Sequence, residues 1–224
     1  MRERPIIFSG PMVRAILDGT KTQTRRVVKP QPESECGGWR WKPRKGWDVN
    51  VDHINASMCP YGVPGDRLWV REAWSAYSWD ANAGWINIRY PTDGKYSNPI
   101  QLRGLKQVEW LDNFAANTHH CDCDDDHFYR IRPSIFMPRW ASRITLEITG
   151  VSVERVQDIS ATDALAEGIA EDLRIGVMSE PTQPDDYIAA FSALWDSINA
   201  KRGFGWDSNP YVWVVEFKRV GADQ

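Results

Sequence analysis

The stretch RPIIFSGPMVRAILDGTKTQTRRVV, residues 4–28, predicts a strand, a helix and a second strand in close succession. Residues 4–8 form a short apolar run that is typical of a strand. Ser9 is the expected N-cap of the helix, Pro11 falls in its first turn, and Gly19 is the residue expected to end it. The helix carries an apolar stripe at helical spacing, made of Met12, Val13, Ile16 and Leu17.

The second strand of this stretch, TQTRRVV, combines cations with hydroxyl groups. Lys21 lies on the tight turn before the strand, and Thr24 lies three residues later, within it. Because Arg25 and Arg26 are like charges close by, they lower the pKa of Lys21, which makes this lysine a candidate base. Thr24 is then a candidate nucleophile, activated if Lys21 takes its proton. The alternative is a basic strand edge that binds phosphate or faces water.

The remaining pattern predicts more strands than helices. Strands are expected at 66–74 (DRLWVREAW), 141–156 (ASRITLEITGVSVERV) and 211–217 (YVWVVEF). Helices are expected at 160–168 (SATDALAEG), where Ser160 and Asp163 form a capping box, and at 184–200.

Residues 78–128 have weak periodicity and many Asn, Gly and Asp residues, so we expect little regular structure there. The whole chain is expected to form one domain, residues 1–224, with an insertion at about 78–127. The fold class is mixed α/β (α+β), in the form of a small β-barrel with helices at its connections.

Charge is distributed unevenly along the chain. The formal net charge is −3, yet residues 1–45 contain eleven Lys and Arg against four Asp and Glu, a local charge of +7. A basic segment in an acidic protein indicates an anionic partner such as a nucleotide or nucleic acid. A solvated basic surface is the alternative that charge alone leaves open.

Three further groups of residues are candidates for a function. RPSIFMPRWASR, residues 132–143, places Arg139 and Arg143 around Trp140, a composition that suits contact with phosphate and stacking on a base. The alternative is an extended arm with Trp140 buried. HHCDCDDDH, residues 119–127, includes Cys121 and Cys123 among metal-ligand residue types, but we interpret it as an acidic loop, not a zinc site. Glu167 ends a short helix, where a carboxylate opposes the helix dipole.

Several of these motifs together resemble the ASCH-domain proteins of phages and prophages, a superfamily similar in fold to the RNA-binding PUA domain. The residues that carry the resemblance are RPIIFSGPMVRAILDGTKTQTRR, CPYGVPGDRLWVREAW, RPSIFMPRWASRITLEITGV, ALAEG and NPYVWVVEF. They occupy roughly 4–76 and 128–219, so the resemblance implies a PUA-like fold for both ends of the chain and nothing for the segment between them.

The small bacterial enzymes of this superfamily are N(4)-acetylcytidine amidohydrolases, with a G-x-K-T-x-T-x-R segment and an A-x-x-E segment. The resemblance to them implies that Lys21 is a base, Thr24 a nucleophile and Glu167 an acid or orienting group. It also places Arg26 at the position of the family's arginine. The chain departs from these enzymes in its greater length and in Gly168, which follows the glutamate.

The expected function is therefore an amidohydrolase that removes an acyl group from the exocyclic amine of a modified cytidine or related nucleoside. Lys21, Thr24 and Glu167 would be catalytic, and Arg25, Arg26, Arg139, Trp140 and Arg143 would bind the substrate. A non-catalytic module that binds RNA or a modified nucleotide in the same pocket is the alternative, and nuclease activity stays open.

We expect no cofactor and no metal at this site. The expected partner is a modified nucleoside or RNA. No apolar run reaches the roughly 20 residues that a membrane span needs, so no membrane partner is expected. The first residues contain only a four-residue apolar run, PIIF, which argues against a secretory signal and favours a cytoplasmic protein. The sequence does not indicate an oligomeric state.

Overall fold

The computed structural model describes residues 1–35, 38–42, 49–50, 54–116, 131–169 and 183–221. The chain divides into two compact units. The first consists of Met1–Arg4, Ala15–Leu68 and Thr145–Gln224, and the second of Pro5–Arg14 and Trp69–Ile144. The single domain expected over residues 1–224 stays a prediction.

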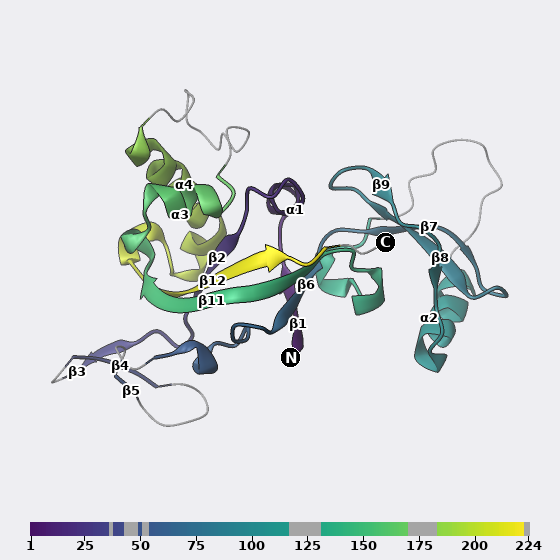
Figure 1. Ribbon diagram of the computed structural model, residues 1–224, viewed down its shortest axis with the longest axis horizontal. Coiled ribbons are helices and arrows are strands. Elements are labelled where there is room, and N and C mark those ends of the chain that lie inside the picture. The colour runs from purple at the N-terminus through teal and green to yellow at the C-terminus, as the bar shows by residue number, and fades with distance from the viewer. Residues whose placement is uncertain (36–37, 43–48, 51–53, 117–130, 170–182, 222–224) are drawn as a thin grey trace. The chain divides into compact units, whose positions relative to one another are not determined.

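A five-stranded sheet has the strand order β1-β6-β11-β12-β2. Its strands are β1 (Glu3–Ile7), β6 (Arg67–Arg71), β11 (Thr145–Arg155), β12 (Tyr211–Arg219) and β2 (Gln23–Val27). The long strands β11 and β12 pair antiparallel (Figure 1), with a register shift between Ile148 and Gly150. Strand β12 also pairs antiparallel with β2, which places Val215 opposite Thr24.

Three helices accompany the strands of this sheet in the chain: α1 (Gly10–Leu17), α3 (Ala161–Ala166) and α4 (Pro184–Asn199). The predicted capping box of α3 is confirmed, since Ser160 Oγ accepts a hydrogen bond from Asp163 N and Asp163 Oδ2 accepts one from Ser160 N. Helix α3 lies beside α4 in the first unit (Figure 1). Their apolar faces share one buried cluster with β12: Val156, Ile159, Ala164, Ile169, Ala190, Phe191, Trp195, Val212 and Val214.

The first unit also contains a small sheet of the order β3-β4-β5, with β3 at Glu33–Glu35, β4 at Gly38–Trp41 and β5 at Val49–Asn50. Short 3₁₀ helices complete the described elements of the chain: η2 (Ala56–Met58), η3 (Ser134–Phe136), η4 (Arg139–Ala141), η5 (Val156–Asp158), η6 (Ala200–Arg202) and η7 (Trp206–Ser208).

The expectation of little regular structure at 78–128 is wrong for the described part of that segment. Strands β7 (Ser75–Asp80), β8 (Trp85–Tyr90) and β10 (Ile100–Gln101) form a sheet in the order β10-β8-β7, with β9 (Lys95–Tyr96) paired to β8. Helix α2 (Leu105–Ala116) follows.

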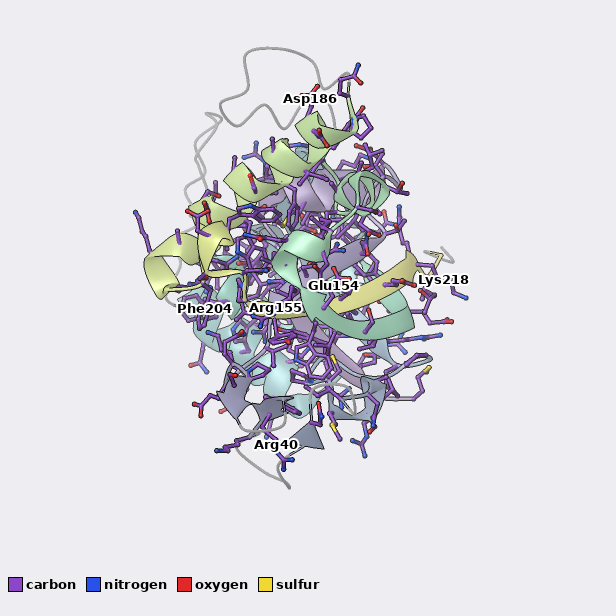
Figure 2. All side chains as sticks on the ribbon, turned by 90° about the vertical axis from the view of Figure 1, so that its left-hand side faces the viewer. Arg40, Glu154, Arg155, Asp186, Phe204 and Lys218 are labelled. Carbon is purple, nitrogen blue, oxygen red and sulfur yellow. The ribbon has the colours of Figure 1, made fainter. Side chains whose placement is uncertain are left out.

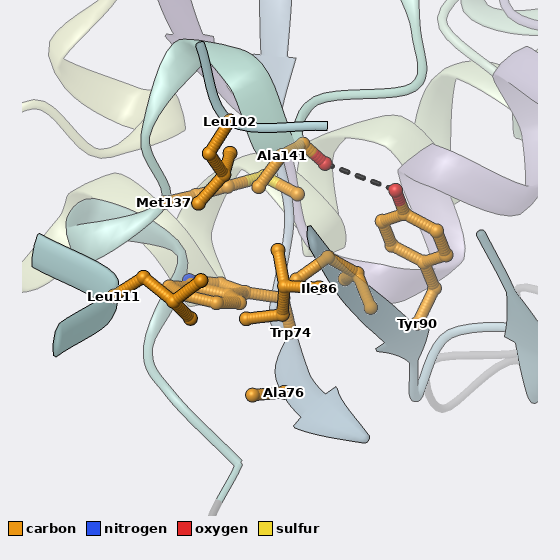
Figure 3. Packing of buried hydrophobic residues seen from close by; sticks show 9 residues of the cluster. Trp74, Ala76, Ile86, Tyr90, Leu102, Leu111, Met137 and Ala141 are labelled. Carbon is orange, nitrogen blue, oxygen red and sulfur yellow. Dashed lines mark hydrogen bonds between the residues drawn. The ribbon is translucent and has the colours of Figure 1, made fainter. Parts of the chain in front are cut away.

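Alternation along β8 explains why this segment folds. Ile86, Ile88 and Tyr90 are buried at every second position, and they pack in the core of the second unit (Figure 3). The Tyr90 hydroxyl donates a hydrogen bond to Ala141 O at 3.0 Å. The period-two pattern was present in the sequence, but the frequent Asn and Gly residues around it obscured it.

The mixed α/β fold class is confirmed by this arrangement of sheets and helices. Closure of the strands into a PUA-like barrel stays a prediction. Within the residues that the structure describes, no helix is both long enough and apolar enough to cross a membrane.

Candidate functional site

Lys21 is brought against Glu167 by two local backbone features of the first unit. After α1 the chain turns at Gly19, whose φ of 80° favours glycine. Lys21 N then donates a hydrogen bond to Ala15 O at 3.0 Å, and Thr22 N donates one to Ala166 O at 2.8 Å. Lys21 and Glu167 consequently form an isolated antiparallel β-bridge between the start of β2 and the end of α3.

Gly168 makes this approach possible. Its φ is +82°, and a Cβ at this position would lie 2.9 Å from Ala15 Cβ and 3.0 Å from Lys21 Cβ. The first distance is shorter than real carbon–carbon contacts, and the second is tight enough that Lys21 would have to shift. The positive φ and the close approach of the bridge therefore favour a glycine after Glu167.

The Lys21 ammonium is buried among three oxygen acceptors. Lys21 Nζ donates to Glu167 Oε2 at 2.7 Å, to Glu167 O at 2.7 Å and to Gln23 O at 2.8 Å. Burial disfavours the charged form and lowers the pKa of Lys21; Glu167 acts in the opposite direction, while Arg26 and Arg25 lower the pKa further. The net effect is a lysine that loses its proton more readily than an ordinary one.

Arg25 extends this cluster to two more carboxylates. Its guanidinium contacts Glu154 Oε1 through Nε at 2.8 Å and through NH2 at 2.7 Å. It also contacts Glu167 Oε1 at 3.4 Å and Asp163 Oδ2 at 3.5 Å. The Arg25 side chain is only 1% exposed, so these internal ion pairs occupy a residue that we expected to contact a substrate. That substrate contact stays a prediction.

The pKa values of two carboxylates around Arg25 are shifted in opposite directions. Burial raises the pKa of Glu154, and the positive charge of Arg25 opposes that effect. Burial alone would also raise the pKa of Asp163, but hydrogen bonds from Gln23 and Ser160 outweigh it, so the pKa of Asp163 is lowered. Gln23 Nε2 donates to Asp163 O at 3.0 Å and to Asp163 Oδ1 at 2.9 Å, which ties β2 to α3.

Thr24 and Arg26 alternate with Gln23 and Arg25 along β2, so their side chains project from the other face of the strand. Thr24 is 3% exposed. It is not among the three acceptors of Lys21 Nζ named above. Burial lowers the pKa of Arg26, with Tyr61 and Glu167 acting to raise it. The roles expected for Thr24 and Arg26 stay predictions.

The other three expected substrate-binding residues belong to the second unit. Arg143 forms two hydrogen bonds with Glu72, at 2.9 and 3.0 Å, and one with Asp93 at 2.8 Å. The ring of Trp140 packs edge-on against Trp110 and Trp74. Arg139 is exposed. The structure therefore brings together Lys21, Arg25 and Glu167 from the predicted set, and it groups Arg143 with carboxylates of its own unit.

A cavity of about 340 Å³ adjoins the Lys21 cluster and shares Gln23 and Asp163 with it. Its lining is rich in hydroxyl and carboxylate oxygens and consists of Thr22, Gln23, Thr149, Asp163, Ala166, Glu216 and Phe217. This lining differs from the basic surface for an anionic partner that the charge of residues 1–45 indicated.

The sequence analysis missed Glu154, Thr149 and Glu216. For Thr149 one signal was available, since Thr149-Gly150 interrupts the alternation of its strand where the structure has a register shift. Glu154, seen from the side in Figure 2, carried no local signal, because only folding brings it to Arg25.

Metal ligands are not clustered in the described part of the chain: no group of three or more His, Cys, Asp or Glu residues there could hold an ion. Cys121 and Cys123, with the whole segment 119–127, lie outside the described residues. Cys59 is buried, and burial raises the pKa of its thiol.

Comparison of the chain with family models, curated proteins and solved structures gives no match. The site must therefore be interpreted from its own geometry.

Proposed function

We propose that this protein is an amidohydrolase that removes an acyl group from the exocyclic amine of a modified cytidine or related nucleoside. The observation that carries the proposal is the buried contact of Lys21 Nζ with Glu167 Oε2 at 2.7 Å, between side chains that are 0% and 6% exposed. A buried lysine with a lowered pKa next to a carboxylate is a pair suited to proton transfer.

The reaction would proceed in two steps. Thr24 Oγ attacks the amide carbonyl while neutral Lys21 accepts its proton, so that a C–O bond forms. The C–N bond then breaks, and the proton passes to the leaving amine with the help of Glu167. Water hydrolyses the acyl-threonine ester in the second step, releasing a carboxylic acid and restoring the Thr24 hydroxyl. Because Lys21 Nζ donates to Glu167 and Gln23 in the structure, this step requires it to exchange one of these acceptors for Thr24 when substrate binds.

The adjoining cavity supports a nucleoside as the substrate class. Its volume, about 340 Å³, lies at the lower end of the range for small-molecule pockets. The oxygens of Thr22, Thr149 and Glu216 are acceptors for the hydroxyl and amine protons of a nucleoside.

A non-catalytic module that binds RNA or a modified nucleotide is the second candidate. It is favoured by the three hydrogen bonds of Lys21 to Glu167 and Gln23, which match the three protons of an ammonium. In that case Lys21 would be a fixed charge and not a base.

The test is incubation of the pure protein with N(4)-acetylcytidine, measuring the release of cytidine and acetate and, in parallel, nucleoside binding by calorimetry. Thr24→Ala should abolish release and retain binding, because it removes the nucleophile but no charge. Thr162→Ala, at an exposed position of α3, is the matched control and should behave as wild type. Binding without release by the wild type would overturn the amidohydrolase and leave the binding module.

A further inference from the structure

The Arg25 guanidinium contacts three carboxylates: Glu154 and Glu167, which lie on different elements, and Asp163 at 3.5 Å. It contacts Glu154 of β11 twice, at 2.8 and 2.7 Å, and Glu167 at the end of α3 once, at 3.4 Å. The Glu167 oxygen that faces Arg25 is Oε1, whereas Lys21 Nζ binds Oε2. One carboxylate is thus shared between two cations, and each cation holds a different oxygen.

We propose that Arg25 is a positioning residue: anchored on Glu154, it holds Oε1 of Glu167 and so presents Oε2 to Lys21. The planar guanidinium suits this task because its donors point in fixed directions and reach two carboxylates at once. A lysine at the same position would keep the charge but could not span both partners. This positioning role rests on the proposed function in one respect only, namely that Lys21 acts as a base.

Because Arg25 and Lys21 share the Glu167 carboxylate, Arg25 also affects how readily Lys21 loses its proton. The charged groups that face this pair of cations are Glu167 and Asp163 from α3, Glu154 from β11 and Arg26 from β2. Arg25 repels the Lys21 ammonium and competes with it for Glu167, so both effects favour neutral lysine. Glu154 limits both effects, because it neutralises Arg25 and draws it toward β11.

Two substitutions should therefore move the pKa of Lys21 in opposite directions. Arg25→Gln removes the competitor, leaves both oxygens of Glu167 to Lys21 and should raise its pKa. Glu154→Gln frees Arg25 to turn toward Glu167 and should lower the pKa of Lys21. A variant that merely loosened the fold would expose Lys21 and return its pKa toward the ordinary value in both cases.

The experiment is a carbon-13 NMR titration of Lys21 in protein labelled at lysine Cε, with Lys21→Met to assign the signal. It compares wild type, Arg25→Gln, Arg25→Lys and Glu154→Gln. Lys218→Gln is the control, because it also removes a cation paired with a glutamate, at 3.0 Å, on the same sheet, but its side chain is 64% exposed. Melting curves identify any variant that does not fold. If Arg25→Gln does not fold, the titrations of Glu154→Gln and Arg25→Lys still test the proposal.

Opposite shifts in Arg25→Gln and Glu154→Gln, with no shift in Lys218→Gln, are expected. Where the acylated nucleoside is turned over, Arg25→Lys should also lose roughly tenfold to hundredfold in kcat, because a misplaced reacting group costs about that much. Shifts of the same sign, or a wild-type titration in Arg25→Gln, would overturn the positioning role even if turnover persists. Absence of turnover in every protein would overturn the proposed function alone, because the titration does not depend on it.

Discussion

Arg25 in the first unit and Arg143 in the second are both held by carboxylates, but they use them differently. Arg143 takes both oxygens of Glu72, at 2.9 and 3.0 Å, and adds Asp93 at 2.8 Å, with its guanidinium 4.0 Å from the Tyr90 ring centre. Arg25 takes one oxygen of Glu154 and approaches one oxygen of Glu167, whose other oxygen belongs to Lys21. In the first arrangement one cation takes both oxygens of Glu72, and in the second the two oxygens of Glu167 are divided between two cations.

The largest loss of stability should come from breaking the ion pair of Arg143 and Glu72. Glu72 is 1% exposed, so Arg143→Ala would leave a buried carboxylate without the two guanidinium donors that now bind its oxygens. We expect the free energy of unfolding to fall by about 3–5 kcal/mol. Arg25→Ala should cost less, because Glu167 keeps Lys21 and the Glu154 side chain is 26% exposed. Chemical denaturation measures both, and a smaller loss for Arg143→Ala than for Arg25→Ala would contradict the comparison.

A smaller loss of stability is expected at Gly168, where the backbone positions Glu167, the carboxylate shared by Arg25 and Lys21. Gly168→Ala places a Cβ 2.9 Å from Ala15 Cβ at a φ of +82° and should cost about 1–3 kcal/mol. Gly19→Ala is the matched control, since its φ is +80° but nothing lies within 4 Å of the added carbon. Gly168→Ala should therefore destabilise more and also perturb the Lys21 signal. Equal losses and an unchanged Lys21 would show that the close approach does not shape the site.

The smallest effect on stability is expected at Tyr90, whose ring lies against Arg143. Burial raises the pKa of Tyr90 above its ordinary value of about 10, and Arg143 opposes that shift. Because the folded state holds the phenol proton more tightly than the unfolded state, the stability that Tyr90 contributes is present below about pH 10 and lost as the pH rises above it.

Tyr90→Phe should cost about 1 kcal/mol at neutral pH through the lost hydrogen bond to Ala141 O. Its stability should then fall less steeply above pH 10 than that of the wild type. Unfolding followed at a series of alkaline pH values checks this, and parallel curves for the two proteins would refute it.

Local signals in the sequence predicted local structure well. The capping box of Ser160 and Asp163 and the apolar stripe of α1 lie within single elements, so they could be found without the fold. The turn that carries Lys21 was also predictable, because Gly19 ends a recognisable helix. The alternation of Ile86, Ile88 and Tyr90 was equally local, and we missed it by giving more weight to the neighbouring turn residues.

The contacts that define the candidate site are of another kind. Lys21 meets Glu167 across 146 positions, and Arg25 meets Glu154 across 129. No periodicity encodes such pairs. Glu167 was indicated by its unfavourable position at the end of a helix and by the resemblance, and nothing indicated Glu154. Arg143 was predicted from its basic and aromatic neighbourhood to contact a ligand, and folding also brings it to Glu72 and Asp93. The ligand contacts expected for Arg139, Trp140 and Arg143 stay predictions.

We infer that burial in this cluster holds Lys21 ready to act as a base. The most direct test is the pKa of Lys21 in the wild-type protein without ligand, measured by carbon-13 titration of its Cε signal. We expect a pKa clearly below the ordinary value of a lysine side chain. A pKa at or above that ordinary value would show that Glu167 outweighs burial and that Lys21 is a permanent charge.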